Sequence, residues 1–191
     1  MKTRAYVDVS FVAGAGPSSW AIELWGGGEF SHVDAVVPEW YCRSKGIPSG
    51  SLLGARSDEI LHEAIWLPAG VQIRPPAYEV WPKRLVLRTP CTEDQAFDWW
   101  KFLESQIGRK YDTIGLLESF TSLLGHPRNW RDPSAWWCSE LVGAAGEAGQ
   151  IFQVPLPKWK LTPGDCAIAY GAAGGFPILR VGLDKWQFST A

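Results

Sequence analysis

The spacing of apolar residues changes at about residue 90, and this change constrains the fold more than any other feature of the sequence. Before it, apolar residues alternate with polar ones or form short valine-rich runs, which is typical of β-strands. After it, most apolar residues recur at helical spacing. A chain that is mostly β first and mostly α afterwards predicts an α+β domain, in which an antiparallel sheet packs against helices.

The first half contains one short helical segment, 19–25, and several segments with the strand pattern. A stretch rich in Gly, Pro and Ser, 39–50, is expected to be an irregular loop. The sequence LPAG predicts a hairpin turn that joins the segments 59–66 and 71–75. The strands expected in this half are 5–12, 31–37, 51–56, 59–66, 71–75 and 84–90.

The second half contains four segments with helical spacing and ends with one strand. In the first of them, Thr92 is suited to cap the helix, acidic residues fill the first turn and Gly108 ends it. The third opens at Pro133 or Ser134. The helices are expected at 92–108, 112–125, from 133 or 134 to about 150, and 162–173, and the strand at 176–183.

Length and charge narrow the function classes. The 191 residues are expected to form a single domain over 1–191. The net charge is −2 and the basic residues are scattered, so we expect no nucleic-acid partner. No apolar run is long enough to span a bilayer. Asp8 interrupts the first apolar stretch, which therefore indicates a strand rather than a signal peptide, and we expect a cytoplasmic protein.

The four cysteines do not follow the pattern of a metal site or a disulfide framework. No two of them form a CxxC pair, and no histidine lies at ligand spacing from any of them. We therefore expect no metal, no other cofactor and a reducing compartment. The cysteines are Cys42, Cys91, Cys138 and Cys166.

Cys138 is the cysteine whose surroundings point most clearly to chemistry. It lies in the sequence SAWWCSELVG, in the opening turns of an expected helix. Unpaired backbone N–H groups and the helix dipole favour an anion there and lower the pKa of a thiol. Cys166 has a similar place after TPGD but no distinctive neighbours. From the residues alone, Cys138 is either a nucleophile or a buried structural cysteine.

A nucleophilic cysteine needs an imidazole as a proton acceptor, and the chain has three histidines. His126 lies in a polar loop and is expected to be solvated. His32 lies in a valine-rich strand, where it is either structural or catalytic. His62 and Glu63 are adjacent on an expected strand and point to opposite faces, so only one of them can share a face with His32.

Several motifs together resemble a known family. IGRKYD and, after a helix and a loop, WWCSELVGAAGEAG resemble the cysteine half of NlpC-type cysteine peptidases. SHVDAVV and LHEAIW precede the cysteine here, and LTPGDCA resembles the closing Pro-Gly-Asp segment. This order resembles the circularly permuted branch of the papain-like fold, the YiiX-like and lecithin–retinol-acyltransferase-like proteins. The resemblance covers roughly Tyr6 to Tyr170 and implies a permuted papain-like fold.

The resemblance also implies roles for individual residues. Cys138 would be the nucleophile and His32 the general base. Glu63 would orient His32, with His62 as the alternative. Tyr111 would line the cleft near the oxyanion, which the backbone N–H of Cys138 would also bind.

The sequence departs from the family pattern at two positions. Val7 stands where the first strand often has glycine, and Asp34 stands two residues after the histidine, where glycine is usual. Asp34 shares a strand face with His32 and could replace Glu63 as the orienting acid. Its short side chain would have to lean back along its own strand, whereas Glu63 could lie directly opposite on a neighbouring strand. We therefore expect Glu63 to support His32.

The implied activity is hydrolysis of an amide through an acyl-Cys138 intermediate. The substrates would be peptides, cell-wall peptides, isopeptides or lipid-linked amides. The twelve tryptophans indicate either a tryptophan-rich core or a cleft for an apolar or glycan-bearing substrate. Two alternatives stay open: an acyltransferase of the lecithin–retinol-acyltransferase-like branch, and a non-catalytic binding domain on the same fold.

Overall fold

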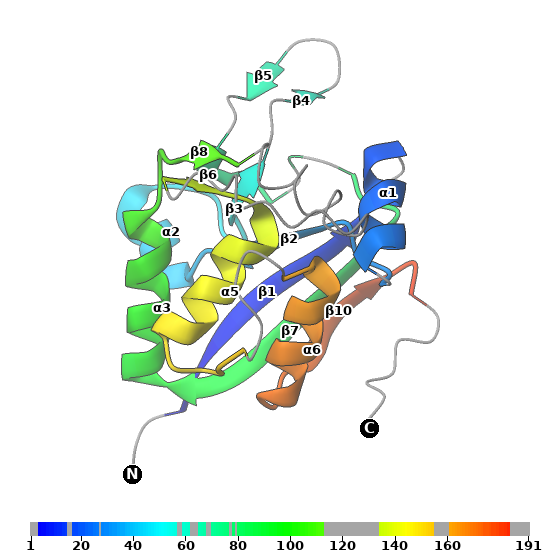
Figure 1. Ribbon diagram of the computed structural model, residues 1–191. Helices are drawn as coiled ribbons and strands as arrows, with labels where there is room; N and C mark the ends of the chain where they lie inside the picture. Colours follow the sequence, from blue (N-terminus) through cyan, green and yellow to red (C-terminus); the bar gives the residue numbers. More distant parts are fainter. Residues whose placement is uncertain are drawn as a thin grey trace.

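A six-stranded antiparallel sheet forms the centre of the computed structural model (Figure 1). Its strands lie in the order β10-β7-β1-β2-β3-β6. They are β1 (Arg4–Ala13), β2 (His32–Val36), β3 (Leu52–Arg56), β6 (Gly70–Arg74), β7 (Lys83–Thr92) and β10 (Phe176–Val181). The structure describes residues 4–14, 17–26, 28–56, 59–61, 65–67, 70–76, 78, 80–112, 134–154 and 161–183.

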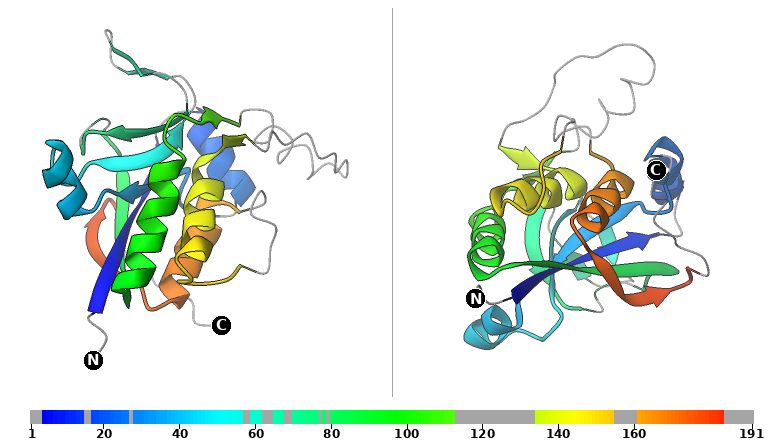
Figure 2. Two further views of the ribbon diagram at one scale, coloured as in Figure 1. Left: turned by 90° about the vertical axis from the view of Figure 1, so that its left-hand side faces the viewer. Right: turned by 90° about the horizontal axis from the view of Figure 1, so that it is seen from below.

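Three helices lie in a row along one face of this sheet, as the right-hand view of Figure 2 shows. They are α3 (Glu93–Ser105), α5 (Cys138–Ala148) and α6 (Pro163–Ala172). Strand alternation explains why they pack there. Val7, Val9 and Phe11 of β1 are buried in the core, while Asp8 and Ser10 lie on the opposite face and contact arginines of β7. The α+β architecture with an antiparallel sheet is confirmed.

Most of the expected elements are present. The expected strands at 5–12, 31–37, 51–56, 71–75, 84–90 and 176–183 correspond to the six strands above, and the helix expected at 19–25 is α1 (Pro17–Gly26). Thr92 caps α3 by accepting a hydrogen bond from the backbone N–H of Gln95, whose side chain accepts one from Thr92 in return. Thr162 and Asp165 form the same capping box at α6.

The third helix begins later than expected. Ala135–Trp136 form a short strand, β9, which pairs in parallel with β8 (Lys110–Tyr111). α5 therefore starts only at Cys138, with Trp137 as its cap residue. The helix expected at 112–125 falls mostly on residues outside the described ranges.

The prediction of a loop over 39–50 was wrong in its first half, which is helix α2 (Glu39–Lys45). Glu39 in the first turn and Arg43 and Lys45 in the last turn complement the helix dipole. Gly46 adopts a left-handed conformation (φ 66°) and ends the helix. The Gly, Pro and Ser residues that suggested a loop are concentrated after this point.

The prediction of one strand over 59–66, joined in a hairpin to 71–75, was also wrong. This region forms two three-residue strands, β4 (Glu59–Leu61) and β5 (Ile65–Leu67), which pair with each other and project from the main sheet (Figure 1). β6 pairs instead with β3. An apolar run predicts a strand but does not identify the neighbour with which it pairs. None of the described helices is long and apolar enough to cross a membrane.

Candidate active site

The structure brings Cys138 and His32 together at the end of the sheet where β2 begins. His32 is the first residue of β2 and Cys138 the first residue of α5, which packs on β2. Both side chains are buried, and the sulfur and the imidazole lie close enough for each to shift the pKa of the other. The backbone of Val33 also helps to lower the pKa of Cys138.

Asp34 is the carboxylate that holds His32. Its Oδ1 lies 2.8 Å from His32 Nε2, and its side chain is 2 % exposed. Because Nε2 faces Asp34, the other ring nitrogen, Nδ1, is the one available to Cys138. The hydroxyl of Tyr78 donates to the second carboxylate oxygen, Oδ2, at 2.7 Å. His32, Asp34 and Tyr78 are therefore linked by hydrogen bonds, and Cys138 lies beside His32.

Contrary to the prediction from strand geometry, Asp34 is well placed for His32, since the two side chains form a hydrogen bond along their own strand. The premise for Glu63 was wrong as well. The neighbours of β2 are β1 and β3, and Val12 is the residue of β1 that pairs with His32. Glu63 itself lies outside the described residues, so its role stays a prediction.

Gly54 on the neighbouring strand β3 makes room for Asp34. A Cβ atom at this position would overlap with Oδ1 of Asp34. Glycine inside a strand often marks such a close approach. The glycine in SLLGAR therefore indicated that some group approaches this strand closely, but not which group.

Aromatic and cationic side chains cover the histidine and its acid. Trp81 stacks on His32, with 5.9 Å between the ring centroids and 15° between the planes. Arg56 lies over both Trp81 and Tyr78, at 5.1 and 5.2 Å from the ring centroids. Sequence reasoning missed Tyr78 and Trp81, because they lie between β6 and β7, where apolar spacing gives no pattern.

A buried arginine completes the support of Asp34. Arg74, 3 % exposed, donates hydrogen bonds to the backbone carbonyls of Gly54 at 2.9 Å and Gly70 at 3.3 Å. Its charge helps to lower the pKa of Asp34. A cation fixed by backbone carbonyls beside a buried carboxylate favours the ionised carboxylate.

The electrostatics of the site favour a thiolate–imidazolium pair. Burial would lower the pKa of His32, but the charges of Asp34 and Cys138 and its hydrogen bonds to both raise that pKa to about 9. Burial would raise the pKa of Cys138, but the charge of His32 and the hydrogen bonds from His32 and Val33 lower it below its ordinary value. The pKa of Asp34 is also held well below its ordinary range, against burial, chiefly by His32.

Within the described residues, no histidine is paired with any of the other three cysteines. Cys166 is buried, its thiol donates to the Ser139 carbonyl at 3.3 Å, and burial raises its pKa well above the ordinary value. Burial also raises the pKa of Cys42 and of Cys91. Cys138 is therefore the one cysteine of the chain whose pKa is lowered.

The backbone pairing of a short strand brings Tyr111 close to the segment that leads into Cys138. Tyr111 pairs with Trp136 in the short β8–β9 ladder, and Trp136 precedes Cys138 by two residues. Its expected place near the oxyanion stays a prediction. His62 and His126 lie outside the described residues. Within the described part of the chain, no group of three or more His, Cys, Asp or Glu side chains is arranged to hold a metal ion.

The fold and the site together define an α+β protein in which a buried cysteine lies beside a buried histidine that is hydrogen-bonded to a buried aspartate. No known family profile matches the chain, and no curated protein matches it. Among solved structures, the chain is similar to the crystal structure of the metalloprotein yiiX from Escherichia coli O157:H7. The two are 17 % identical, and the TM-score is 0.47 over 77 % of this chain and 68 % of that chain.

Proposed function

We propose that the protein is a cysteine hydrolase that cleaves amide bonds through an acyl-Cys138 intermediate, on a circularly permuted papain-like (NlpC-type) fold. The observation that carries this proposal is the geometry of three buried side chains. Cys138 lies beside the imidazole of His32, and that imidazole is fixed on its far side by the carboxylate of Asp34 at 2.8 Å. This is the arrangement that nucleophilic catalysis by a thiol requires.

The first half-reaction uses the ion pair. The Cys138 thiolate attacks the carbonyl carbon of the substrate amide, and the oxygen that becomes negative accepts a hydrogen bond from the Cys138 backbone N–H at the start of α5. The C–N bond then breaks while Nδ1 of His32 gives its proton to the leaving amine. The products of this step are a free amine and a thioester on Cys138.

The second half-reaction restores the ion pair. Neutral His32 takes a proton from a water molecule, whose oxygen attacks the thioester carbonyl carbon. The C–S bond breaks, the carboxylic acid leaves, and the sulfur departs as the thiolate beside the protonated imidazole. No cofactor is consumed in either half.

Asp34 is proposed to be the orienting acid. By accepting the Nε2–H hydrogen bond, it fixes the tautomer in which Nδ1 faces the sulfur. Tyr78 supports this role because its hydroxyl donates a hydrogen bond to Oδ2 of Asp34. Gly54 supports it because the absence of a side chain there leaves space for the Asp34 carboxylate. Glu63 remains the competing candidate.

The proposed substrates are peptides, including cell-wall peptides and isopeptides, and lipid-linked amides. An activated ester such as para-nitrophenyl acetate tests the chemistry without knowledge of the natural substrate. We expect a burst of one equivalent of nitrophenol and an acetyl group on Cys138, detected by intact mass and peptide mapping, followed by release in water. Cys138→Ser should abolish the burst, and Cys166→Ser is the matched control that should retain it.

Two outcomes would contradict the proposal. An acetyl group on Cys42 or Cys91, with Cys138 unmodified in the folded protein, would remove the nucleophile. Release of the acyl group only after addition of an amine or alcohol would replace the hydrolase with an acyltransferase. A panel of cell-wall peptides and isopeptides, assayed for amine release, then defines the substrate.

A further inference from the structure

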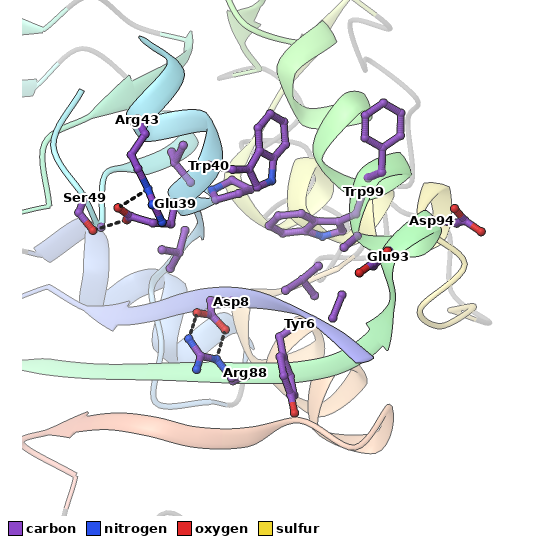
Figure 3. Close-up of a pocket in the computed structure, with 18 residues that line it drawn as sticks. Tyr6, Asp8, Glu39, Trp40, Arg43, Ser49, Arg88, Glu93, Asp94 and Trp99 are labelled. Carbon is purple, nitrogen blue, oxygen red and sulfur yellow. Dashed lines mark hydrogen bonds and ion pairs between the residues drawn. The ribbon is translucent and has the colours of Figure 1, made fainter. Parts of the chain in front are cut away.

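A cleft of about 990 Å³ lies between the first half of β1, helix α2 and the start of α3 (Figure 3). This cleft is separate from the Cys138 site. His32 pairs with Val12 of β1, whereas the cleft reaches β1 at Ala5–Asp8. Four residues of extended strand from Val12 to Asp8 span roughly 13 Å. The mechanism proposed above leaves the cleft without a role.

The edge of β1 is open in this cleft. β1 pairs with β7 along its whole length, from Arg4 to Ala13, but it pairs with β2 only from Val9 to Val12. β2 ends at Val36, after which the chain turns away into α2. In the described ranges, no strand pairs with Arg4–Asp8 on the β2 side. Some backbone N–H and C=O groups of this stretch therefore have no strand as a partner.

Consecutive residues of β1 line the cleft, which places it at this edge of the strand. Val7 lies on the helix-covered face of the sheet, and Tyr6 and Asp8 lie on the opposite face, yet all three line the same cleft. Successive strand residues point to opposite faces. Lining by residues whose side chains point to both faces agrees with a cleft that lies along the edge of β1.

The walls of the cleft present aromatic surface. Trp40 of α2 and Phe97 of α3 line the cleft and are 54 % and 56 % exposed. The buried Trp99 lines the same cleft, and Figure 3 shows it together with Trp40. Concave aromatic surface beside a free strand edge is the combination by which proteins bind an extended peptide as an added strand.

The charges of the cleft favour a basic occupant. Asp8 pairs with Arg88 at 2.7 Å, and Glu39 pairs with Arg43 at 3.3 Å, so these four charges balance. Two more lining carboxylates, in the first turn of α3, have no ion pair within the described part of the chain. They are Glu93 and Asp94, and they leave the cleft with a net negative charge.

We propose that this cleft binds an extended, basic peptide segment of a partner protein, which adds as a strand to the open edge of β1. Apolar side chains of the peptide contact Trp40 and Phe97, and a lysine or arginine lies near Glu93 and Asp94. The peptide backbone supplies the hydrogen bonds that β2 supplies further along β1. Peptide binding at this cleft does not depend on the acyl-cysteine chemistry, so the two proposals are tested separately.

The test uses an acetylated and amidated hexapeptide of alternating valine and lysine, titrated into the full chain labelled with 15N. We expect saturable binding, with the largest changes of amide chemical shift and the strongest new protection from hydrogen exchange in Ala5–Asp8. Two control peptides carry N-methyl groups on either the valine or the lysine amides. Only alternate amides face a neighbouring strand, so one of these two peptides should lose at least about tenfold in affinity.

Variants of exposed residues sharpen the test without disturbing the core. Trp40→Ala and Phe97→Ala should each weaken binding at least about fivefold, because both remove apolar contact surface. Trp20→Ala, which removes a tryptophan that is 65 % exposed on α1, is the matched control and should have no effect. Reversal of charge at Glu93 and Asp94 together should weaken binding at least about threefold at low salt.

Three results would overturn the proposal. The first is the absence of binding at millimolar peptide. The second is equal affinity for the parent and both N-methylated peptides, which would show attraction by charge alone. The third is a response confined to the other sheet edges, at β6 or β10. None of these three results would bear on the burst of nitrophenol that tests the proposed hydrolase activity of Cys138.

Discussion

Cys138 and Cys166 stand near the starts of two adjacent helices, are both buried, and yet have opposite acid–base properties. Cys138 is the first residue of α5, and Cys166 is the fourth of α6. The pKa of Cys138 is lowered, and that of Cys166 is raised well above the ordinary value. A place near a helix start therefore does not by itself produce a thiolate when the sulfur is buried.

The difference comes from what lies across from each sulfur. Cys138 meets His32 and a backbone N–H of β2. Cys166 meets a backbone carbonyl, and the negative charges of Cys138 and Asp165 add to the effect of burial in raising its pKa. The sheet, which brings the imidazole, thus determines which of two similar helix starts carries the nucleophile.

The largest expected effect comes from His32→Ala, which should make Cys138 resemble Cys166. Without the imidazole, burial of the sulfur dominates, and the pKa of Cys138 should rise. Alkylation of Cys138 by iodoacetamide at pH 7 should then slow by about 100-fold, because the thiolate fraction falls. Mass spectrometry of labelled peptides measures the rate. An unchanged rate, with the fold intact by circular dichroism, would separate the reactivity of Cys138 from His32.

Asp34→Asn should have the next largest effect. The amide cannot stabilise the imidazolium, so the turnover of an acyl substrate should fall by at least about tenfold, equivalent to about 1.4 kcal/mol. Glu63→Gln is the matched comparison and should have the smaller effect. If Glu63→Gln proves more damaging while both variants fold equally well, the orienting acid has been assigned to the wrong carboxylate.

Tyr78→Phe should have the smallest effect of the three. Asp34 keeps its charge and its bond to His32, but loses one hydrogen bond on its second oxygen. We expect a loss of turnover of about threefold, in line with one weakened contact at a distance from the sulfur. The pKa of His32, measured by NMR titration, should change by less than in Asp34→Asn. Tyr6→Phe, at an exposed tyrosine of β1, is the control.

The sequence allowed the α+β class, the capped start of α3 at Thr92 and the meeting of Cys138 with His32 to be predicted, whereas the start of α5 was placed too early. These depend on local signals, namely apolar periodicity, capping boxes and the order of motifs along the chain. The acid and its supports could not be predicted in the same way. Asp34 was judged by distance along a strand, and nothing in the sequence showed that Gly54 and Tyr78 would hold its side chain against His32. Strand neighbours depend on pairing over long separations, which is why the segment around Glu63 was placed in the wrong sheet.

The most direct test of the central claim is the pH dependence of iodoacetamide labelling at Cys138 and Cys166, measured in the same folded sample. Thiolate is the reactive form, so a lowered pKa should bring Cys138 to half of its plateau rate well below pH 9. Between that pH and about 9, where His32 loses its proton, the ion pair persists and the rate should stay nearly constant. Cys166 should remain unlabelled over the same range. Labelling of both cysteines at similar rates, rising together at or above pH 9, would contradict the claim that His32 activates Cys138.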